Sequence, residues 1–431
     1  MENNNNFGMN NGFEPQPQND AANVDNGFTV GAYDDFFSGD NNMDTPEFGV
    51  ENQFVAEPMT PPVKKKNKTL LAIIIAAVAV VLAVVLVFVF KGCGSSEDKN
   101  YSKLYNSGLA VVCDNDDGKY GYMNEDGEIV IACDYDSAYA FAKNGLALVG
   151  VYDENNGWEY GYINTDGEYV ITPQFEDANS FADNGLALAC EDDKYGYINE
   201  DGEWEIEPQF DYARSFSDDF AVVGQKKDSG EYSYEYEYGY INKNGEVVID
   251  YQFDYAYSFS DGLARVEDGD EYGFINEDGE WAIEAQFAYA GDFAENGLAV
   301  VREDEDGDYG YINKDGEVVI ACQFDSAQEF GDNGLAAVRD SDEWGFIDED
   351  GEFVIEPKYD NAAPFVNGKA LAMRKNKYYI IDENGEETKL TGIDGLAGAY
   401  EDYLVFKDND KYGVMDWDGN IVIDAQFKDI G

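Results

Sequence analysis

Carboxylates are the most abundant side chains in this sequence that could do chemistry. The 431 residues include 90 Asp and Glu and no His, so neither a Ser-His-Asp triad nor a His-ligated zinc site can form. Paired carboxylates could hydrolyse glycosidic bonds, because the acid and the base of that reaction can both be carboxyl groups. The carboxylates of this chain, however, recur at corresponding positions of a repeated sequence unit, whereas a catalytic site needs one unique constellation. We therefore expect no enzyme activity and no cofactor.

Acidic turns could also bind cations, because calcium prefers clustered carboxylate and carbonyl oxygens. Examples are the turns at 114–118 and 303–308. Neither has the spacing of an EF-hand loop: counting back from Gly118 places Cys113 at the first ligand position. With a net charge of −63, we expect weak binding of calcium or other cations through charge density. The same charge argues against nucleic acid as a partner, since phosphate binding depends on Lys and Arg.

Tyrosines are the third candidate group, and Tyr232, Tyr234 and Tyr236 are the binding residues that we select. They lie in the inserted segment GEYSYEYEYGY and alternate with Ser233 and Glu235. Alternation places the tyrosines on one face of a strand. That face could bind a ligand, or it could pack an extended hairpin on its neighbour, and the sequence leaves both interpretations open.

A repeat must position these residues. An aromatic anchor returns nine times, from Tyr120 to Tyr412, at intervals of 34 to 43 residues. A glycine follows it directly in every copy except the eighth, Tyr378-Tyr379, and another glycine follows seven residues after each anchor, from Gly127 to Gly419. Repeats of 20 to 50 residues are typical of solenoids and propellers.

Each unit reads as three strands. In the third copy, residues 185–190 are an apolar run, 195–199 contain the anchor, and 203–206 alternate after an Asp-Gly turn that favours a hairpin. These features predict an all-β repeat array of three-stranded meander units. Nine such units favour an open curved stack, because propellers usually have 4 to 8 four-stranded blades; a closed β-propeller is the alternative. The variable loops before the anchors should share one face of the array.

The motif YGYIN-xDGE-xVI-xxQF, followed by GLAxV, resembles the WG repeat of bacterial proteins, which is named for its Trp-Gly anchor. The Trp-Gly form occurs here at Trp344-Gly345, and other copies carry Tyr in place of Trp. The resemblance covers roughly residues 99–431. It implies a β-rich repeat domain, often at the cell envelope, and no known activity.

The first 98 residues differ in composition from the repeat. Residues 1–63 hold 11 acidic residues and no Lys or Arg, which predicts a disordered, Asn/Pro-rich cytoplasmic tail. Residues 64–91 form a basic flank plus a transmembrane helix, because Thr69–Phe90 is uncharged and 22 residues long, or about 33 Å as a helix. A short linker at 92–98 precedes the repeat domain at 99–431.

Basic residues predict the orientation of this span. Lys64, Lys65, Lys66 and Lys68 precede it, and a single Lys91 follows it. The positive-inside rule therefore places the N-terminus in the cytoplasm and the repeat domain outside the cell membrane, with one pass through the bilayer at residues 69–90.

Together these features predict a membrane-anchored, non-enzymatic cell-surface repeat protein that binds protein or glycan partners at the bacterial envelope. One alternative is a transmembrane sensor or assembly factor that couples the outer array to the cytoplasmic tail. Another is an envelope carbohydrate-active enzyme.

Overall fold

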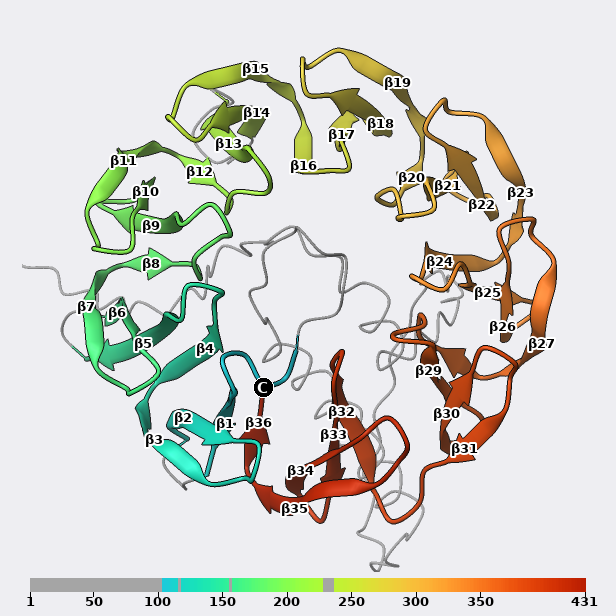
Figure 1. Ribbon diagram of the computed structural model, residues 1–431. Helices are drawn as coiled ribbons and strands as arrows, with labels where there is room; N and C mark the ends of the chain where they lie inside the picture. Colours follow the sequence, from blue (N-terminus) through green and yellow to red (C-terminus); the bar gives the residue numbers. More distant parts are fainter. Residues whose placement is uncertain (1–102, 115–117, 155–156, 228–235) are drawn as a thin grey trace, which may run out of the picture.

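The protein forms a closed ring of β-sheets. A computed structural model describes residues 103–114, 118–154, 157–227 and 236–431. In these residues 36 strands build nine four-stranded antiparallel sheets, arranged as blades around a central axis (Figure 1). The all-β repeat prediction is confirmed as a nine-bladed β-propeller. The expected open stack is wrong, and the alternative of a closed propeller is confirmed.

Each blade has the same order of strands from the axis to the rim, and we number the blades 1 to 9 along the chain. The innermost strands of blades 1 to 9 are β36 (Asp429–Ile430), β4 (Ser137–Phe141), β8 (Asp177–Ala178), β12 (Tyr212–Ala213), β16 (Tyr255–Ser260), β20 (Tyr289–Ala290), β24 (Ser326–Phe330), β28 (Asn361–Ala362) and β32 (Gly395–Ala399). The second strands are β1 (Leu109–Cys113), β5 (Ala147–Asp153), β9 (Ala187–Glu191), β13 (Phe220–Lys226), β17 (Leu263–Asp268), β21 (Leu298–Arg302), β25 (Ala336–Asp340), β29 (Lys369–Met373) and β33 (Leu404–Asp408).

The third strands carry the aromatic anchors, and the outer strands form the rim. The third strands are β2 (Tyr120–Asn124), β6 (Gly157–Ile163), β10 (Lys194–Ile198), β14 (Tyr236–Asn242), β18 (Glu271–Asn276), β22 (Tyr309–Asn313), β26 (Glu343–Ile347), β30 (Tyr378–Asp382) and β34 (Lys411–Met415). The outer strands are β3 (Ile129–Tyr135), β7 (Tyr169–Phe175), β11 (Trp204–Phe210), β15 (Val247–Phe253), β19 (Trp281–Phe287), β23 (Val318–Phe324), β27 (Phe353–Tyr359), β31 (Glu387–Lys389) and β35 (Ile421–Phe427).

The expected three-stranded unit lacks the innermost strand, and that part of the prediction is wrong. Five of the nine innermost strands, such as β8 and β12, are only two residues long, and the other four have five or six residues. A pair of residues cannot show the alternation that marks a strand in sequence, so this segment reads as a loop between units. In the structure it crosses from the rim of one blade to the axis of the next (Figure 1).

The glycine after each anchor allows a bulge between the third and outer strands. In blade 2 the register shifts across Gly161, between Tyr160 and Tyr162, and again between Tyr162 and Ile163. A Cβ added at Gly161 would lie 2.6 Å from the carbonyl oxygen of Ile171. Blade 8 has Tyr379 at this position, and its β30–β31 pairing is regular, with Tyr379 opposite Lys389. The missing glycine therefore accompanies a missing bulge and a three-residue outer strand.

The hairpin between the third and outer strands has the same geometry in every blade. In blade 3 the side-chain oxygen of Asn199 accepts hydrogen bonds from the backbone N–H groups of Asp201 and Glu203, at 3.1 and 3.0 Å. Gly202 follows with a φ of +78°, a conformation that glycine adopts at little cost. This confirms the predicted Asp-Gly turns and shows that the preceding Asn also holds the turn.

Neighbouring blades are joined by two recurring contacts. In the first contact, the hairpin glycine packs on an isoleucine of the preceding blade. A Cβ added at Gly202, for example, would lie 3.1 Å from the Ile171 side chain. In the second contact, the tyrosine two residues after the anchor donates its hydroxyl to a backbone carbonyl of the next blade. Tyr197 bonds the carbonyl of Arg214 at 2.7 Å and is fully buried. The aromatic core positions thus join units, as their recurrence predicts.

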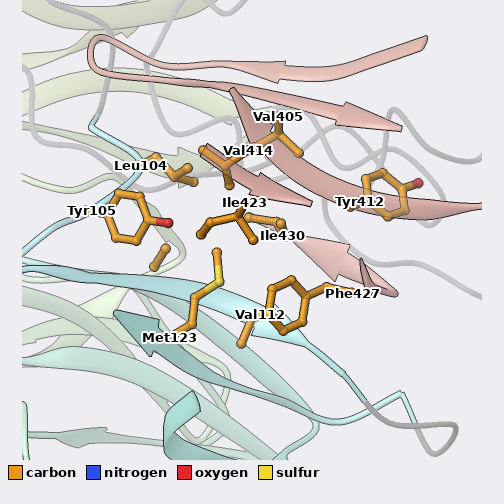
Figure 2. Close-up of a cluster of buried hydrophobic side chains, with 11 residues drawn as sticks. Leu104, Tyr105, Val112, Met123, Val405, Tyr412, Val414, Ile423, Phe427 and Ile430 are labelled. Carbon is orange, nitrogen blue, oxygen red and sulfur yellow. The ribbon is translucent and has the colours of Figure 1, made fainter. Parts of the chain in front are cut away.

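Blades 1 and 9 meet at the point where the ring closes. Strand β36, at the C-terminal end, completes blade 1 by pairing Val112 with Ile430 and Cys113 with Asp429. Figure 2 shows side chains from both ends of the described chain in one cluster, including Leu104, Met123 and Ile430. Closure therefore depends on two residues from the far end of the sequence, and a pairing over that separation leaves no local pattern.

The two faces of the ring carry different connections. The hairpins between third and outer strands lie on the same side of the ring as the links between innermost and second strands. Asn144 of one such link bonds Glu200 of a hairpin at 3.2 Å, and Lys314 of a hairpin bonds Asp261 of another link at 2.5 Å. We call this the hairpin face. The opposite side, which we call the loop face, carries the loops between second and third strands.

The N-terminal predictions fall on residues that the structure does not describe. The tail at 1–63, the proposed membrane span at 69–90 and the linker at 92–98 all lie outside the described ranges. Among residues 103–431, apart from the three short gaps, no helix is long and apolar enough to cross a bilayer.

Candidate binding face

Length variation is concentrated on the loop face. The loop between the second and third strands is a two-residue turn in blade 3, Asp192-Asp193, whereas in blade 4 it runs from Lys226 to Tyr236. In blade 2 the longer connection extends the hairpin itself, so that Tyr152 pairs with Trp158 beyond the end of the shorter blades. The expectation that insertions share one face agrees with this arrangement.

A carboxylate at the start of blades 2, 3, 4, 5, 7, 8 and 9 fixes the base of the loop in that blade. Asp254 accepts the backbone N–H of Gly269 at 2.9 Å and the ammonium of Lys227 at 2.6 Å. These bonds to Lys227 and Gly269 lower the pKa of Asp254. Asp325 accepts the N–H of Ser341 in the same way at 2.9 Å. Much of the recurring acidity of the repeat therefore has a structural role at this face.

The predicted tyrosine site is only partly described. Tyr232 and Tyr234 lie outside the described residues. Tyr236 begins β14 and is half-buried, with its ring 5.9 Å from that of Tyr212 and 6.1 Å from that of Tyr238. This residue therefore packs on its own blade, and it stands at the end of a longer aromatic row.

We call this run of seven tyrosines over blades 4 to 6 the tyrosine row. Successive ring centres are 5.0 to 6.5 Å apart. Its members are Tyr212, Tyr238, Tyr255, Tyr257, Tyr272, Tyr289 and Tyr309. Burial raises the pKa of Tyr257 and of Tyr289 to about 12, although Arg265 opposes the rise at both. These hydroxyls stay protonated near neutral pH and can act as hydrogen-bond donors.

Two buried arginines, Arg214 and Arg265, contact tyrosines of the tyrosine row. Arg214 is 1% exposed and donates to the hydroxyls of Tyr212 and Tyr255 at 2.9 and 2.6 Å. Arg265 is 5% exposed, with its Cζ 3.7 Å from the ring centre of Tyr257 and its Nε 3.7 Å from the Asp292 carboxylate. Cation–π contacts of this kind stabilise a desolvated guanidinium. This arc of the ring is thus aromatic and cationic in an otherwise acidic protein.

The comparisons with known proteins agree with the repeat. The model described as "WG containing repeat" matches seven segments, at 120–154, 160–195, 195–227, 238–272, 272–305, 309–342 and 344–378, which cover more than half of the chain. The chain belongs to the WG-repeat family. No curated protein matches the sequence.

Solved structures show distant likenesses to this WG-repeat ring. A eukaryotic initiation factor is 10% identical, with a TM-score of 0.44, and the match covers 67% of this chain and 85% of that one. Dipeptidyl peptidase 4 of Porphyromonas gingivalis is 11% identical, with a TM-score of 0.40, covering 78% and 59%. Apo AztD from Citrobacter koseri is 10% identical, with a TM-score of 0.36, covering 65% and 93%.

The WG-repeat motif residues have defined places in the ring. The anchor tyrosine Tyr195 donates to Asp177 of the innermost strand at 3.2 Å, and burial raises the pKa of that carboxyl despite this hydrogen bond. Tyr120 and Asp429 repeat the arrangement where the ring closes. Across the described ranges, no group of three or more acidic or Cys side chains is placed to hold a metal ion; weak cation binding stays a prediction.

Sequence reasoning missed the arginines of the WG-repeat ring. Arg265 stands where neighbouring copies carry apolar residues such as Val222 and Val300. Its counterpart Asp292 stands where other copies have Ser or Ala, as at Ser215. A charged residue of each sign at two apolar or small positions of adjacent units was the signal that could have identified this pair.

Proposed function

We propose that this WG-repeat protein is a non-enzymatic binding protein, anchored in the cell membrane by residues 69–90, whose propeller presents its loop face to a protein or glycan partner at the envelope. A β-propeller of WG repeats suits a protein-binding or ligand-binding role, because it supplies a rigid ring with variable loops on one side. No step of this role needs a catalytic group.

The observation that carries the proposal is the contrast between the two faces. The nine hairpins keep one geometry, with a positive-φ glycine in each, whereas the loop face varies in length and carries exposed aromatic side chains. Tyr152 and Trp158 are 55% and 40% exposed there, and the ring of Trp158 stacks on Tyr160 at 16° between planes. Aromatic side chains supply contact area at interfaces.

The path of the chain supports an outward loop face. The described chain begins beside blade 9 on the hairpin face, where the N–H of Leu104 bonds the carboxylate of Asp402 at 2.9 Å. Only residues 91–102 separate Phe90 from Lys103, and such a tether spans roughly 45 Å when fully extended. In the proposed topology the hairpin face therefore lies nearer the bilayer and the loop face points away.

Two measurements test this function. Trypsin added to intact cells should cleave the repeat domain, and protection in intact but not lysed cells would refute the topology. Binding of the full chain to isolated envelope fragments should then depend on the loop face. Fragments treated with protease or with periodate would separate protein partners from glycan partners.

The structure suggests a matched pair of variants for the binding measurement. Residues 226–236 of blade 4 can be replaced by Asp-Asp, because the blade 3 hairpin closes with that turn at the equivalent register. This removes the predicted site, Tyr232, Tyr234 and Tyr236, and should weaken envelope binding if that loop contributes. The control changes the exposed hairpin residues Glu277 and Asp278 to Ala and should bind as the parent does. Equal loss in both would contradict a loop-face site.

A further inference from the structure

Arginine is restricted to one arc of the ring. The chain has five arginines, and they lie on five consecutive blades, 4 to 8: Arg214, Arg265, Arg302, Arg339 and Arg374. Three of them have acceptors. Arg214 bonds tyrosine hydroxyls, Arg265 bonds the carbonyl of Ala290, and Arg374 makes two bonds to the Glu387 carboxylate at 3.0 and 2.7 Å.

The remaining two arginines, Arg302 and Arg339, differ from these in their surroundings. Within the described ranges, neither Arg302 nor Arg339 has a carboxylate oxygen within 4.0 Å or a hydrogen-bonded acceptor, and the Nε of each is buried without a partner. Guanidinium groups in folded proteins usually find acceptors. The chain has 90 acidic residues, yet no anion among the described residues pairs with these two arginines of adjacent blades. We therefore infer that their anion comes from a ligand.

These two arginines occupy the same position on neighbouring blades. Arg302 ends β21, between its strand partners Tyr289 and Tyr309, and its Cζ lies 5.3 Å from the ring centre of Tyr309. Arg339 lies in β25, between its strand partners Ser326 and Trp344. Both are therefore next to the loop face at the junction of blades 6 and 7.

The tyrosine row stops at this junction. Tyr255 and Tyr289 of blades 5 and 6 place a ring against the anchor tyrosine of the blade before them, at 5.1 and 6.5 Å. Blade 7 carries Ser326 at the same position. Among the described residues, Tyr309 accordingly has no aromatic partner from blade 7, and a small hydroxyl side chain stands between two guanidinium-bearing strands.

We propose that Arg302 and Arg339, with Tyr309 and Ser326, bind a carboxylated sugar of an acidic glycan; this inference rests on the proposed function and names its ligand class. A guanidinium can bind a carboxylate through two parallel hydrogen bonds. The tyrosine ring supplies an apolar face for the sugar ring, and the serine hydroxyl can donate to or accept from a sugar hydroxyl.

An acidic peptide also carries carboxylates, but the architecture favours the glycan. Peptides that add to a sheet need a free strand edge, and the blade edges lie at the axis and at the rim rather than on the loop face (Figure 1). A sugar ring stacked on Tyr309 beside the two guanidinium groups can bind without adding a strand to the sheet.

Calorimetry of the full chain in detergent micelles tests the proposal, with an oligogalacturonate as the probe. Binding should exceed that of a neutral oligogalactoside of the same length and should weaken with salt, as charge contacts do. The double change Arg302→Gln and Arg339→Gln should raise the Kd roughly tenfold or more, because each guanidinium loses a charge-assisted bond. The matched control changes Lys375 and Lys377, exposed on the loop of blade 8, to Gln and should leave Kd within about twofold.

If the glutamine variant fails to fold, Arg302→Lys and Arg339→Lys keep the charge, lose the planar fork and should still weaken binding severalfold. Equal affinity for the charged and neutral sugars, or parent-like binding by the arginine variants, would overturn the inference. Tighter, arginine-dependent binding of poly-glutamate would assign the site to an acidic peptide instead. In each of these cases envelope binding through other parts of the loop face would still stand, so the two proposals fail separately.

Discussion

Closure by β36 predicts that Ile430 is a disproportionately important residue of the ring. Its side chain is fully buried and packs with Val112, Met123 and Phe427 where blades 1 and 9 meet (Figure 2). Changing Ile430 to Ala removes three carbon atoms from this cluster and should lower the free energy of unfolding by about 2–5 kcal/mol. Deletion of residues 429–431 should cost more, because the bond from the Gly431 N–H to the Val111 carbonyl is lost as well.

Urea unfolding of the full chain measures this loss, and amide hydrogen exchange locates it. Exchange should accelerate in β1, whose free edge β36 covers, before it does in the blades across the ring. Val422→Ala on the neighbouring strand β35 is the control, because Val422 is 45% exposed and its truncation should change stability by roughly 0.5 kcal/mol or less.

One outcome would refute the reasoning. If deletion of residues 429–431 leaves both the unfolding free energy and the exchange of β1 within about 1 kcal/mol of the parent, β36 does not close the ring. The nine blades would then behave as an open series in which neighbouring units alone supply stability.

Three further changes test the contacts within and between blades. Gly161→Ala should cost about 1–3 kcal/mol in urea unfolding, because its Cβ would lie 2.6 Å from the Ile171 carbonyl oxygen. Gly395→Ala should be close to neutral, because the nearest atom to its Cβ would be the Tyr378 hydroxyl oxygen at 4.0 Å. Equal effects of the two changes would argue against the bulge. Asn199→Ala should cost about 1 kcal/mol through loss of two turn hydrogen bonds, whereas Asn199→Asp, the residue that fills this position in blade 7, should cost less; a difference of zero between them would remove the role of the side-chain oxygen. Burial raises the pKa of Asp429 despite its bond from Tyr120. The stability that this carboxyl adds is therefore present below its unfolded pKa of about 3.9 and is lost as pH rises through the folded pKa. Asp429→Asn should flatten the dependence of thermal stability on pH across that acidic window, and an unchanged pH profile would contradict this role of Asp429.

The repeat made three of the four strands predictable. Fixed spacing between Tyr195 and Gly202 indicated a strand, a tight turn and a second strand, because glycine adopts the positive φ of such a turn at little cost. The structure adds that Asn199 holds this turn. The same spacing indicated which aromatic residues are core, since a side chain that returns in every unit must pack between units.

The fourth strand and the closure were not predictable in this way. Innermost strands of two residues, such as Tyr212–Ala213, have no period, and their identity as strands comes from pairing with β13. The closing pair, Asp429 and Ile430, comes from the far end of the sequence, and a pairing of that separation leaves no local pattern.

The binding residues selected from the sequence, Tyr232, Tyr234 and Tyr236, stay a prediction. Tyr236 was selected from its alternation, and the structure places it at one end of the aromatic row. Arg302 and Arg339 were not selected, because each follows an ordinary apolar second-strand pattern at or next to the end of its strand, where an arginine is unremarkable on a surface. What distinguishes them is that no anion in the described part of the chain bonds to them, which depends on three-dimensional neighbours and not on sequence.

The contact between Leu104 and Asp402 also determines how the ring would respond to mechanical load. Leu104 lies at the junction of the first and last blades, so tension applied through the preceding chain acts across that junction rather than on a continuous blade. Two residue pairs join β36 to β1 there, against five between β1 and β2, so we expect load across the junction to separate β36 from β1 first. A ring tethered in this way would yield at one known place under shear.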